Sequence, residues 1–307
     1  MNNILVTSVS MKVPLIESLI VARDKFDKNI KIIGVDMNTN IIASHFVDEF
    51  CLIKELKYLN KVQIIEFCKE KDIKYVIPTR DDDVLFFSKI KKDLEELSIF
   101  SFCPNISTVK LCYDKLEFSK LRNTIPTYLS VDECHGKRFV LKQRYGAGSL
   151  TLFLDISKEE LVNKIGNLKN PIIQEFIKGQ EYSIDSYVAK NGLLQASIIR
   201  SRDLIINGEA KITTRVFDEK LQEIIKVFLE KNKILGHSVI QVIKKKNKYH
   251  IIECNTRFGG ASTLSYKLGL ESFYWFLQEC NNQDIELNIS PKILKQVRVA
   301  KDIYFES

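Results

Sequence analysis

Residues 251–260 read Ile251-Ile252-Glu253-Cys254-Asn255-Thr256-Arg257-Phe258-Gly259-Gly260, and their interpretation decides that of the whole chain. The apolar start and the closing glycine pair indicate a buried strand that stops at a turn. Side chains two apart on a strand share a face, so Glu253, Asn255 and Arg257 are expected to point the same way. Carboxylate and amide oxygens suit a magnesium ion, and a guanidinium suits a phosphate. A metal–triphosphate site and an exposed edge strand with a polar face explain this stretch about equally well.

The strand before this stretch offers a further oxygen ligand. Two strand patterns flank Lys246-Asn247-Lys248, which indicates a hairpin. If these three residues form the loop, Gln241 lies opposite Glu253, and opposite residues have Cβ atoms about 5 Å apart on one face. Gln241, Glu253 and Asn255 would then converge on one point, which favours a magnesium site over an exposed edge. A loop of four residues would shift this pairing.

The composition is that of a soluble globular protein with room for two or three lobes. The chain has 307 residues, of which 45% are hydrophobic and 28% charged. Its net charge of +7 suits an anionic substrate, but no basic face with a nucleic-acid-binding module is recognisable. The N-terminus lacks the features of a signal peptide, and no apolar run reaches the roughly 18 residues of a membrane span. Without such a module or run, we expect neither a nucleic-acid nor a membrane partner. The seven scattered cysteines contain no CxxC pair, so we expect reduced thiols in the cytoplasm and no zinc site.

Strands and helices alternate over residues 1–106. Repeated βα units predict a parallel sheet with helices on both faces. The first turn, Thr7-Ser8-Val9-Ser10-Met11, lacks the glycine fingerprint of dinucleotide binding, and Asp36 alone is a weak sign of a ribose contact. This unit is therefore expected to be Rossmann-like in shape without its own dinucleotide. The expected strands are Asn3–Val6, Lys31–Asp36, Lys74–Thr79 and Ser98–Phe102, and the expected helices are Lys12–Phe26, Asn60–Lys71 and Asp83–Glu96.

The pattern changes after residue 106. A small α+β lobe is expected over residues 107–178, and a lobe richer in antiparallel strands over residues 179–307. Ser107 is a plausible N-cap for the first helix of the small lobe. The expected strands are Phe139–Lys142, Thr151–Leu154, Pro171–Phe176, Glu181–Ala189, Leu193–Arg200, Ser238–Ile243, Tyr249–Cys254 and Gln296–Val299, and the expected helices are Ser107–Arg122, Ser157–Ile165 and Asp218–Lys231.

A glycine-bearing loop follows Lys142 in the small lobe. Gly146, Gly148 and Ser149 lie between two expected strands, so the loop is not a P-loop. Glycines allow backbone N–H groups to close around an anion, and a serine can add its hydroxyl. Lys142 is a natural partner for a phosphate. Most such loops are plain hairpin turns and a single lysine on a strand is usually solvated, so these residues alone are a weak sign of a phosphate site.

The order of these pieces resembles the ATP-grasp superfamily, and within it the carbamoyl phosphate synthetase-like branch that includes stand-alone carboxylate–amine ligases. The resemblance spans essentially the whole chain. It implies a Rossmann-like first lobe over residues 1–106, followed by a two-lobed ATP-grasp fold over residues 107–178 and 179–307 with Gly179 as a candidate hinge. The matching pieces are Cys112-Tyr113-Asp114-Lys115, Val140-Leu141-Lys142, Gly146–Ser149, Gln174–Asp185, Gln241 and Glu253–Gly260.

The resemblance implies a role for each matching position. Most of these side chains would surround one ATP molecule and its magnesium ion, and a smaller group would face the acceptor. The implied assignments are Lys115 and Lys142 for the phosphates, Gly146, Gly148 and Ser149 for a mobile loop over them, Glu175 and Ile177 for adenine, Glu181 for ribose, Gln241, Glu253 and Asn255 for magnesium, Arg257 for the γ-phosphate, and Asp185, Arg200 and Arg202 for the acceptor side. Because the glycine-rich first turn is absent, the first lobe is expected to contribute little chemistry.

The implied activity is ligation that depends on ATP and Mg²⁺, with Mn²⁺ as a substitute. A small carboxylate would attack the γ-phosphate to give an acyl phosphate, and an amine would then displace phosphate. Lys142 and Arg257 would absorb the charge that develops on the transferred group. Two alternatives are phosphorylation of bicarbonate or carbamate, and an ATP-binding protein without turnover. Dimers are common in the family, so a homodimer is compatible with the sequence, which identifies neither the substrates nor the pathway.

Overall fold

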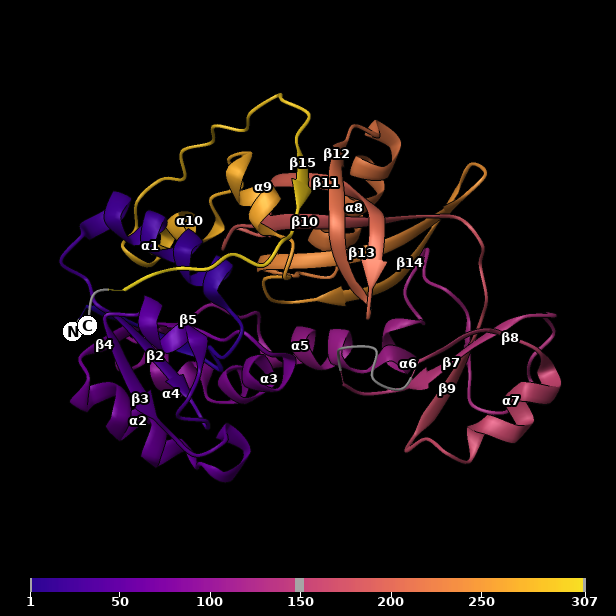
Figure 1. The fold of residues 1–307 in the computed structure, drawn as a ribbon, viewed down its shortest axis with the longest axis horizontal. Helices are drawn as coiled ribbons and strands as arrows, with labels where there is room; N and C mark the ends of the chain where they lie inside the picture. Colours follow the sequence, from indigo (N-terminus) through magenta and orange to yellow (C-terminus); the bar gives the residue numbers. More distant parts are fainter. Residues whose placement is uncertain (1, 147–151, 306–307) are drawn as a thin grey trace.

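The computed structural model describes residues 2–146 and 152–305. Its strands form three sheets that follow one another along the chain (Figure 1). The first sheet is parallel, and the second and third are antiparallel. The expected α/β unit followed by α+β units is therefore confirmed. No helix among the described residues is long and apolar enough to cross a membrane.

The first unit is a doubly covered parallel sheet. Its elements are β1 (Asn3–Thr7), α1 (Val13–Asp27), β2 (Ile32–Asp36), a 3₁₀ turn (Ile42–Phe46), β3 (Glu49–Leu52), a 3₁₀ turn (Leu56–Tyr58), α2 (Lys61–Glu70), β4 (Ile73–Ile77), α3 (Asp81–Lys89), α4 (Lys91–Glu95) and β5 (Phe100–Ser101). Ile4 and Val6 of β1 pack on the α1 side, whereas Leu5 packs on the α2 and α3 side. The strand order is β3-β2-β1-β4-β5. Successive strands are added on one side of β1 up to β3 and on its other side from β4, so the switch point lies between β1 and β4. Ligands of open α/β sheets usually bind at the carboxyl ends of the strands beside such a switch point.

The second unit is a small antiparallel sheet covered by one helix. It contains α5 (Ile106–Tyr113), α6 (Lys115–Phe118), β6 (Thr127–Tyr128), β7 (Phe139–Gln143), β8 (Phe153–Ile156), α7 (Lys158–Ile165) and β9 (Pro171–Glu175). The strand order is β6-β9-β7-β8. Phe139 and Leu141 of β7 pack with Leu161 of α7 in its core.

The helix expected over Ser107–Arg122 is interrupted. Asn105 occupies the N-cap position of α5, so the assignment of the N-cap to Ser107 is wrong. Asp114 then ends α5 and caps α6, because its carboxylate accepts hydrogen bonds from the backbone amides of Leu116 and Glu117. The helix expected over 83–96 is likewise two helices, α3 and α4. These breaks change the direction of the chain where amphipathic periodicity alone predicts one continuous helix.

The third unit carries the longest strands. It contains β10 (Gln180–Val188), β11 (Leu194–Ile206), β12 (Glu209–Val216), α8 (Glu219–Lys231), β13 (Gly236–Lys245), β14 (Lys248–Asn255), α9 (Thr263–Lys267), α10 (Ser272–Cys280) and β15 (Lys295–Val297). The strand order is β14-β13-β10-β11-β12-β15. Ile184, Ile199 and Ile240 pack against Ile225 of α8 on one face. The opposite face of the same strands is largely polar and carries most of the candidate site.

The first and third units share one apolar core. Phe273 and Trp275 of α10 pack in the same cluster as Ile4 and Val6 of β1, and α10 lies beside α1 (Figure 1). The third unit is therefore fixed against the first by buried side chains. Boundaries at residues 106 and 178 separate the three sheets, and their status as domain boundaries stays a prediction.

Candidate nucleotide and metal site

Gln241 and Glu253 lie directly opposite each other on β13 and β14, as predicted. The route to this pairing differs from the prediction, because the turn between the strands is the two-residue Lys246-Asn247. The expectation of a three-residue loop is therefore wrong. A β-bulge at Ile252 supplies the missing residue, since Val242 pairs with Ile251 while Gln241 pairs with Glu253.

The residues implied for magnesium share one face of the third sheet. Asn255 lies opposite Val239, one step along the same face from the Gln241–Glu253 pair. Asn255 Nδ2 donates to Glu253 Oε1 over 3.1 Å. This set offers one carboxylate and two amide oxygens, and the described residues hold no cluster of three His, Cys, Asp or Glu side chains placed for a metal. Its hard oxygen donors fit magnesium as an ion shared with phosphate oxygens, which is how proteins usually bind it.

The two lysines assigned to the phosphates, Lys142 and Lys115, belong to the second unit. Lys142 lies on β7 and is 9% exposed. Burial lowers the pKa of Lys142 to about 8, with Glu253 opposing this shift and Lys115 adding to it. The three residues lie on different elements, with Lys142 on β7, Lys115 at the start of α6 and Glu253 on β14. The charges of Lys115 and Glu253 both act on Lys142.

Asp114 fixes both Lys115 and the start of the predicted phosphate loop. Its carboxylate accepts hydrogen bonds from Arg144, with Nε–Oδ1 at 2.7 Å and Nη2–Oδ2 at 2.5 Å. Lys115 Nζ donates to the carbonyl oxygen of Gly146 over 2.6 Å. Gly146 has φ +95°, a conformation that favours glycine. Gly148 and Ser149, which were assigned to the same loop, lie outside the described residues.

The positions assigned to adenine lie where the second unit connects to the third. Glu175 ends β9, and Ile177 follows it outside any strand. Both residues are partly buried. The Ile177 amide has no backbone partner within residues 2–146 and 152–305. Such an edge could offer its polar groups to a flat base, so the adenine assignment stays a prediction.

Gly179 is a glycine because another backbone lies against it. A Cβ atom at this position would meet the carbonyl oxygen of Lys244 at 2.4 Å and Ile243 Cγ2 at 2.7 Å. The connection into β10 therefore packs tightly on β13. This explains the residue type by close approach, and the predicted hinge role stays a prediction.

Arg202 occupies the polar face beside Glu181, the residue assigned to ribose. Arg202 Nε lies 3.3 Å from Glu181 Oε2, and Arg202 Nη2 donates to the carbonyl oxygen of Gly208 over 2.8 Å. Burial lowers the pKa of Arg202, whereas the charges of Glu181 and Glu253 oppose that shift. Glu181, assigned to ribose, and Arg202, assigned to the acceptor, are therefore in contact with each other.

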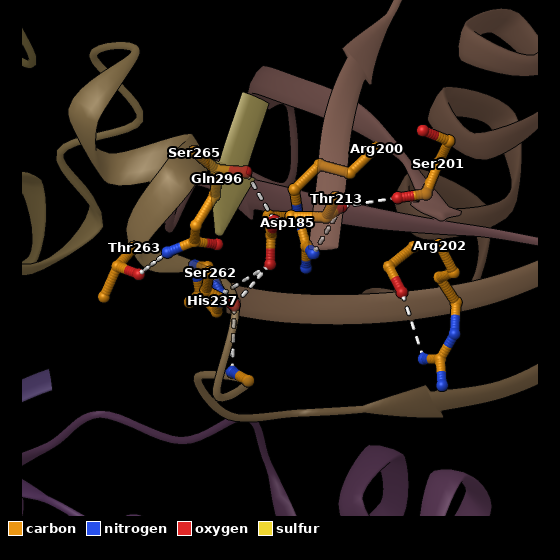
Figure 2. A network of polar contacts seen from close by, with 12 residues as sticks. Asp185, Arg200, Ser201, Arg202, Thr213, His237, Ser262, Thr263, Ser265 and Gln296 are labelled. Atoms are coloured by element: carbon orange, nitrogen blue, oxygen red, sulfur yellow. Dashed lines mark hydrogen bonds and ion pairs between the residues drawn. The ribbon is translucent and has the colours of Figure 1, made fainter. Parts of the chain in front are cut away.

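Asp185 and Arg200 form a buried pair (Figure 2). Asp185 accepts hydrogen bonds from Arg200 Nε, Ser262 Oγ and Ser265 Oγ, each over 2.5 Å. Burial alone would raise the pKa of Asp185, but the Arg200 charge and these donors hold it below its ordinary value. Both carboxylate oxygens are engaged in tying α9 and the turn before it to the sheet. The assignment of Asp185 and Arg200 to the acceptor side stays a prediction. Asp185 is fully buried in this conformation and exposes no surface to a substrate.

Arg257 lies past the end of β14, in the bend that follows Asn255. Its expected place on the strand is therefore wrong. The guanidinium instead forms a bidentate ion pair with Asp81 at the start of α3, with Nε–Oδ1 at 3.0 Å and Nη2–Oδ2 at 2.8 Å. Burial opposes the charge of Arg257, but Asp81 and Glu253 outweigh it and raise the pKa.

Asp81, which contacts the predicted site residue Arg257, was not identified in the sequence analysis. The triplet Asp81-Asp82-Asp83 carries a readable signal, but acidic residues in a first helical turn are already explained by the helix dipole. A cleft of about 320 Å³ adjoins this triplet at the carboxyl ends of the first sheet. Lys12 and Arg80 line the cleft. Through Asp81, the first unit contacts the predicted site residue Arg257. The expectation that this unit contributes little chemistry stays a prediction.

Comparisons with known proteins extend this picture. Residues 4–102 match the family described as PylC-like, N-terminal domain, and residues 167–302 match the family described as ATP-grasp in the biosynthetic pathway with Ter operon. The chain is 22% identical over 269 residues to tyramine–L-glutamate ligase of Methanocaldococcus jannaschii, covering 86% of this chain and 81% of that protein.

Two solved structures have the same fold over nearly the whole chain. The first is the biotin carboxylase domain of 2-oxoglutarate carboxylase from Hydrogenobacter thermophilus, with a TM-score of 0.76, 15% identity, and 94% of this chain and 72% of that chain covered. The second is N5-carboxyaminoimidazole ribonucleotide synthetase from Thermus thermophilus, with a TM-score of 0.74, 14% identity, and 95% and 82% covered. Together with the two family matches, these similarities confirm the resemblance: residues 167–302 form an ATP-grasp domain, and nearly the whole chain shares the fold of these two structures.

Proposed function

We propose that the protein is a ligase that uses ATP and magnesium to join a small carboxylate to an amine. The observation that supports this most strongly is the sheet face shared by Gln241, Glu253 and Asn255. The second unit adds a buried lysine, Lys142. A carboxylate with two amide neighbours and a buried lysine suit a nucleotide triphosphate and its metal ion. An ordinary polar sheet face would not bury Lys142 at a cost to its charge.

ATP would lie between the second and third units. Its phosphates would contact Lys142 and Lys115 beneath the loop that begins at Gly146. The adenine would reach Glu175 and the Ile177 backbone, and the ribose would reach Glu181. Gly148 and Ser149 complete the proposed phosphate loop. Gln241, Glu253 and Asn255 would hold a magnesium ion, which would neutralise part of the phosphate charge. Mn²⁺ favours similar oxygen ligands and is proposed as a substitute.

The chemistry follows from charge and position. An oxygen of the substrate carboxylate attacks the γ-phosphorus, the bond to the β-phosphate oxygen breaks, and ADP leaves. Lys142 and Arg257 stabilise the negative charge on the group in transfer. The amine nitrogen then attacks the acyl carbon, inorganic phosphate leaves, and the surplus amine proton passes to solvent. The products are an amide, ADP and phosphate.

The substrate class is proposed from the relative of known activity. Its name specifies L-glutamate and tyramine, an amino acid and a primary amine. We therefore propose an amino-acid carboxylate and an amine as the substrates here. Arg202 and Arg200 are candidates for the acceptor side, with Asp185 orienting Arg200. A homodimer and a cytoplasmic location remain parts of the same proposal.

A second candidate is the phosphorylation of bicarbonate. It is supported by the fold shared with a biotin carboxylase domain whose structure contains MgADP and bicarbonate. A panel assay separates the candidates by measuring ADP and phosphate with MgATP and either bicarbonate or amino acids, each with and without amines. ADP release that requires an amino acid and an amine supports the ligase. Release that requires bicarbonate supports the second candidate, and nucleotide binding without release under any condition supports a silent binder.

A further inference from the structure

Asp81 belongs to the first unit, yet its carboxylate forms a bidentate ion pair with Arg257, the residue assigned to the γ-phosphate. The two bonds, Nε–Oδ1 at 3.0 Å and Nη2–Oδ2 at 2.8 Å, join residues 176 positions apart in the sequence. We propose that Asp81 is a positioning residue that holds the Arg257 guanidinium ready for the γ-phosphate. This inference rests on the proposed function, because it assigns Arg257 to the nucleotide.

The geometry favours orientation over competition for the arginine. A guanidinium has five N–H donors. Two of them bind Asp81, and Nη1 donates to the carbonyl oxygen of Phe258 over 3.1 Å. Two donors are therefore left for another acceptor while the ion pair stays intact. The side chains of Arg257 and Asp81 retain 16% and 18% exposure, so the pair is accessible at the edge of the site.

Arg257 needs such a partner because no strand holds it. β14 ends at Asn255, so the arginine has no ladder of backbone hydrogen bonds on either side. A bidentate carboxylate fixes both the plane and the direction of a guanidinium, which a single hydrogen bond does not. Asp81 thereby replaces the sheet as the source of order at this position.

Both partners stand on fixed backbone. Next to Asp81, Asp82 accepts a hydrogen bond from Tyr113 Oη over 2.7 Å, and Asp83 accepts one from Thr7 Oγ1 over 2.7 Å. Next to Arg257, the Phe258 ring is stacked between His237 and Phe273, with centroids 3.8 Å and 4.1 Å away. Neither side of the ion pair can shift without disturbing these contacts. Each partner of the ion pair is therefore held in place by the contacts of its own neighbours in the sequence.

Nucleotide affinity tests this role without knowledge of the acceptor. The affinities for MgADP and for a magnesium complex of β,γ-imido-ATP are measured for the full chain and for Asp81→Ala, Asp81→Asn and Arg257→Ala. Asp93→Ala is the matched control, since Asp93 forms an exposed ion pair with Lys61 in the same unit. We expect Asp81→Ala to weaken the triphosphate analogue about tenfold and to change ADP affinity by less than about twofold. Asp81→Asn keeps the shape and one acceptor, so it should give a smaller loss of the same kind.

A double variant, Asp81→Ala with Arg257→Ala, completes the test. If Asp81 acts through Arg257, the double variant binds the analogue no more weakly than Arg257→Ala alone. Additive losses would overturn the inference, as would equal weakening of ADP and the analogue in Asp81→Asn, because Asp81 would then only dock the two units. If Asp81→Ala binds the triphosphate analogue and MgADP as the unaltered chain does, while Arg257→Ala binds the analogue more weakly, the inference is overturned and the proposed function stands. Failure of the unaltered chain to bind either nucleotide would overturn both.

Discussion

Arg200 Nε lies 2.5 Å from Asp185 Oδ2, and the two side chains are 2% and 0% exposed. Such a pair is stable only while both charges are present. Asp185 also accepts hydrogen bonds from Ser262 and Ser265. One carboxylate therefore links the central strand β10 to α9 and the turn before it, which follow β14 in the chain (Figure 2). The pair therefore serves the site by holding its backbone.

Asp185→Ala should lower the free energy of unfolding by about 3–5 kcal/mol, because it leaves the Arg200 charge buried without a partner. The folded-state pKa of Asp185 is below its ordinary value, so its contribution is present above the unfolded pKa of about 3.9 and is lost as pH falls through the folded pKa. Urea unfolding at several pH values measures both effects. A change no larger than that of the exposed Asp93→Ala variant would contradict this assignment.

Lys142 predicts an alkaline loss of ATP binding. Its pKa of about 8 means that it is charged below that pH and neutral above it. The kcat/KM for ATP should therefore fall as pH rises through about 8. At saturating ATP the fall should move to higher pH, since bound phosphates favour the charged lysine. Lys142→Arg keeps its charge at these pH values and should remove the alkaline fall; an unchanged profile in this variant would exclude Lys142 as its cause.

Gly179 predicts a steric effect on stability. In Gly179→Ala the new Cβ would meet a backbone oxygen at 2.4 Å, and the clash should cost about 1–3 kcal/mol of unfolding free energy. Gly166→Ala is the matched control, because nothing lies within 4 Å of its Cβ position and its φ is −66°. The control should be neutral or slightly stabilising. Equal thermal midpoints for the two variants would argue against the close approach.

The strand pattern was sufficient to place Glu253, Asn255 and Gln241 on one face, because periodicity in β-strands is local. It was not sufficient to predict the turn length and the strand register, because the two-residue turn and the bulge at Ile252 compensate each other and leave no separate trace in the sequence. The alternation of strands and helices likewise predicted the parallel first sheet. Strand β12 was missed despite a readable signal, because Asn207-Gly208 favours a two-residue hairpin turn.

Asp81 could not be predicted in the same way. Its contact with Arg257 depends on how the first unit packs on the third, through an apolar core to which α1 and α10 contribute. The burial of Asp185 and Arg200 was also hidden, because charged residues on a strand are ordinarily exposed. Pairing across strands and between units is non-local, and a single sequence carries little record of it.

Glu253 provides a test of the metal assignment. Glu253→Gln keeps the shape and removes the only charge among the three proposed ligands. Magnesium-dependent ADP release should fall by at least about 100-fold, with a smaller loss of metal-free nucleotide binding. Titration of Mg²⁺ into the variant with and without ADP separates loss of metal from loss of fold. Turnover unchanged from that of the unaltered chain would exclude Glu253 as a ligand.

The acyl phosphate is the central claim, and oxygen transfer tests it most directly. The carboxylate identified by the substrate panel, with L-glutamate as the first choice, is labelled with ¹⁸O and incubated with MgATP and an amine. The inorganic phosphate is then analysed by mass spectrometry. The account predicts one ¹⁸O atom in each phosphate released with ADP, and no labelled phosphate from Glu253→Gln. Amide formation with unlabelled phosphate would contradict it.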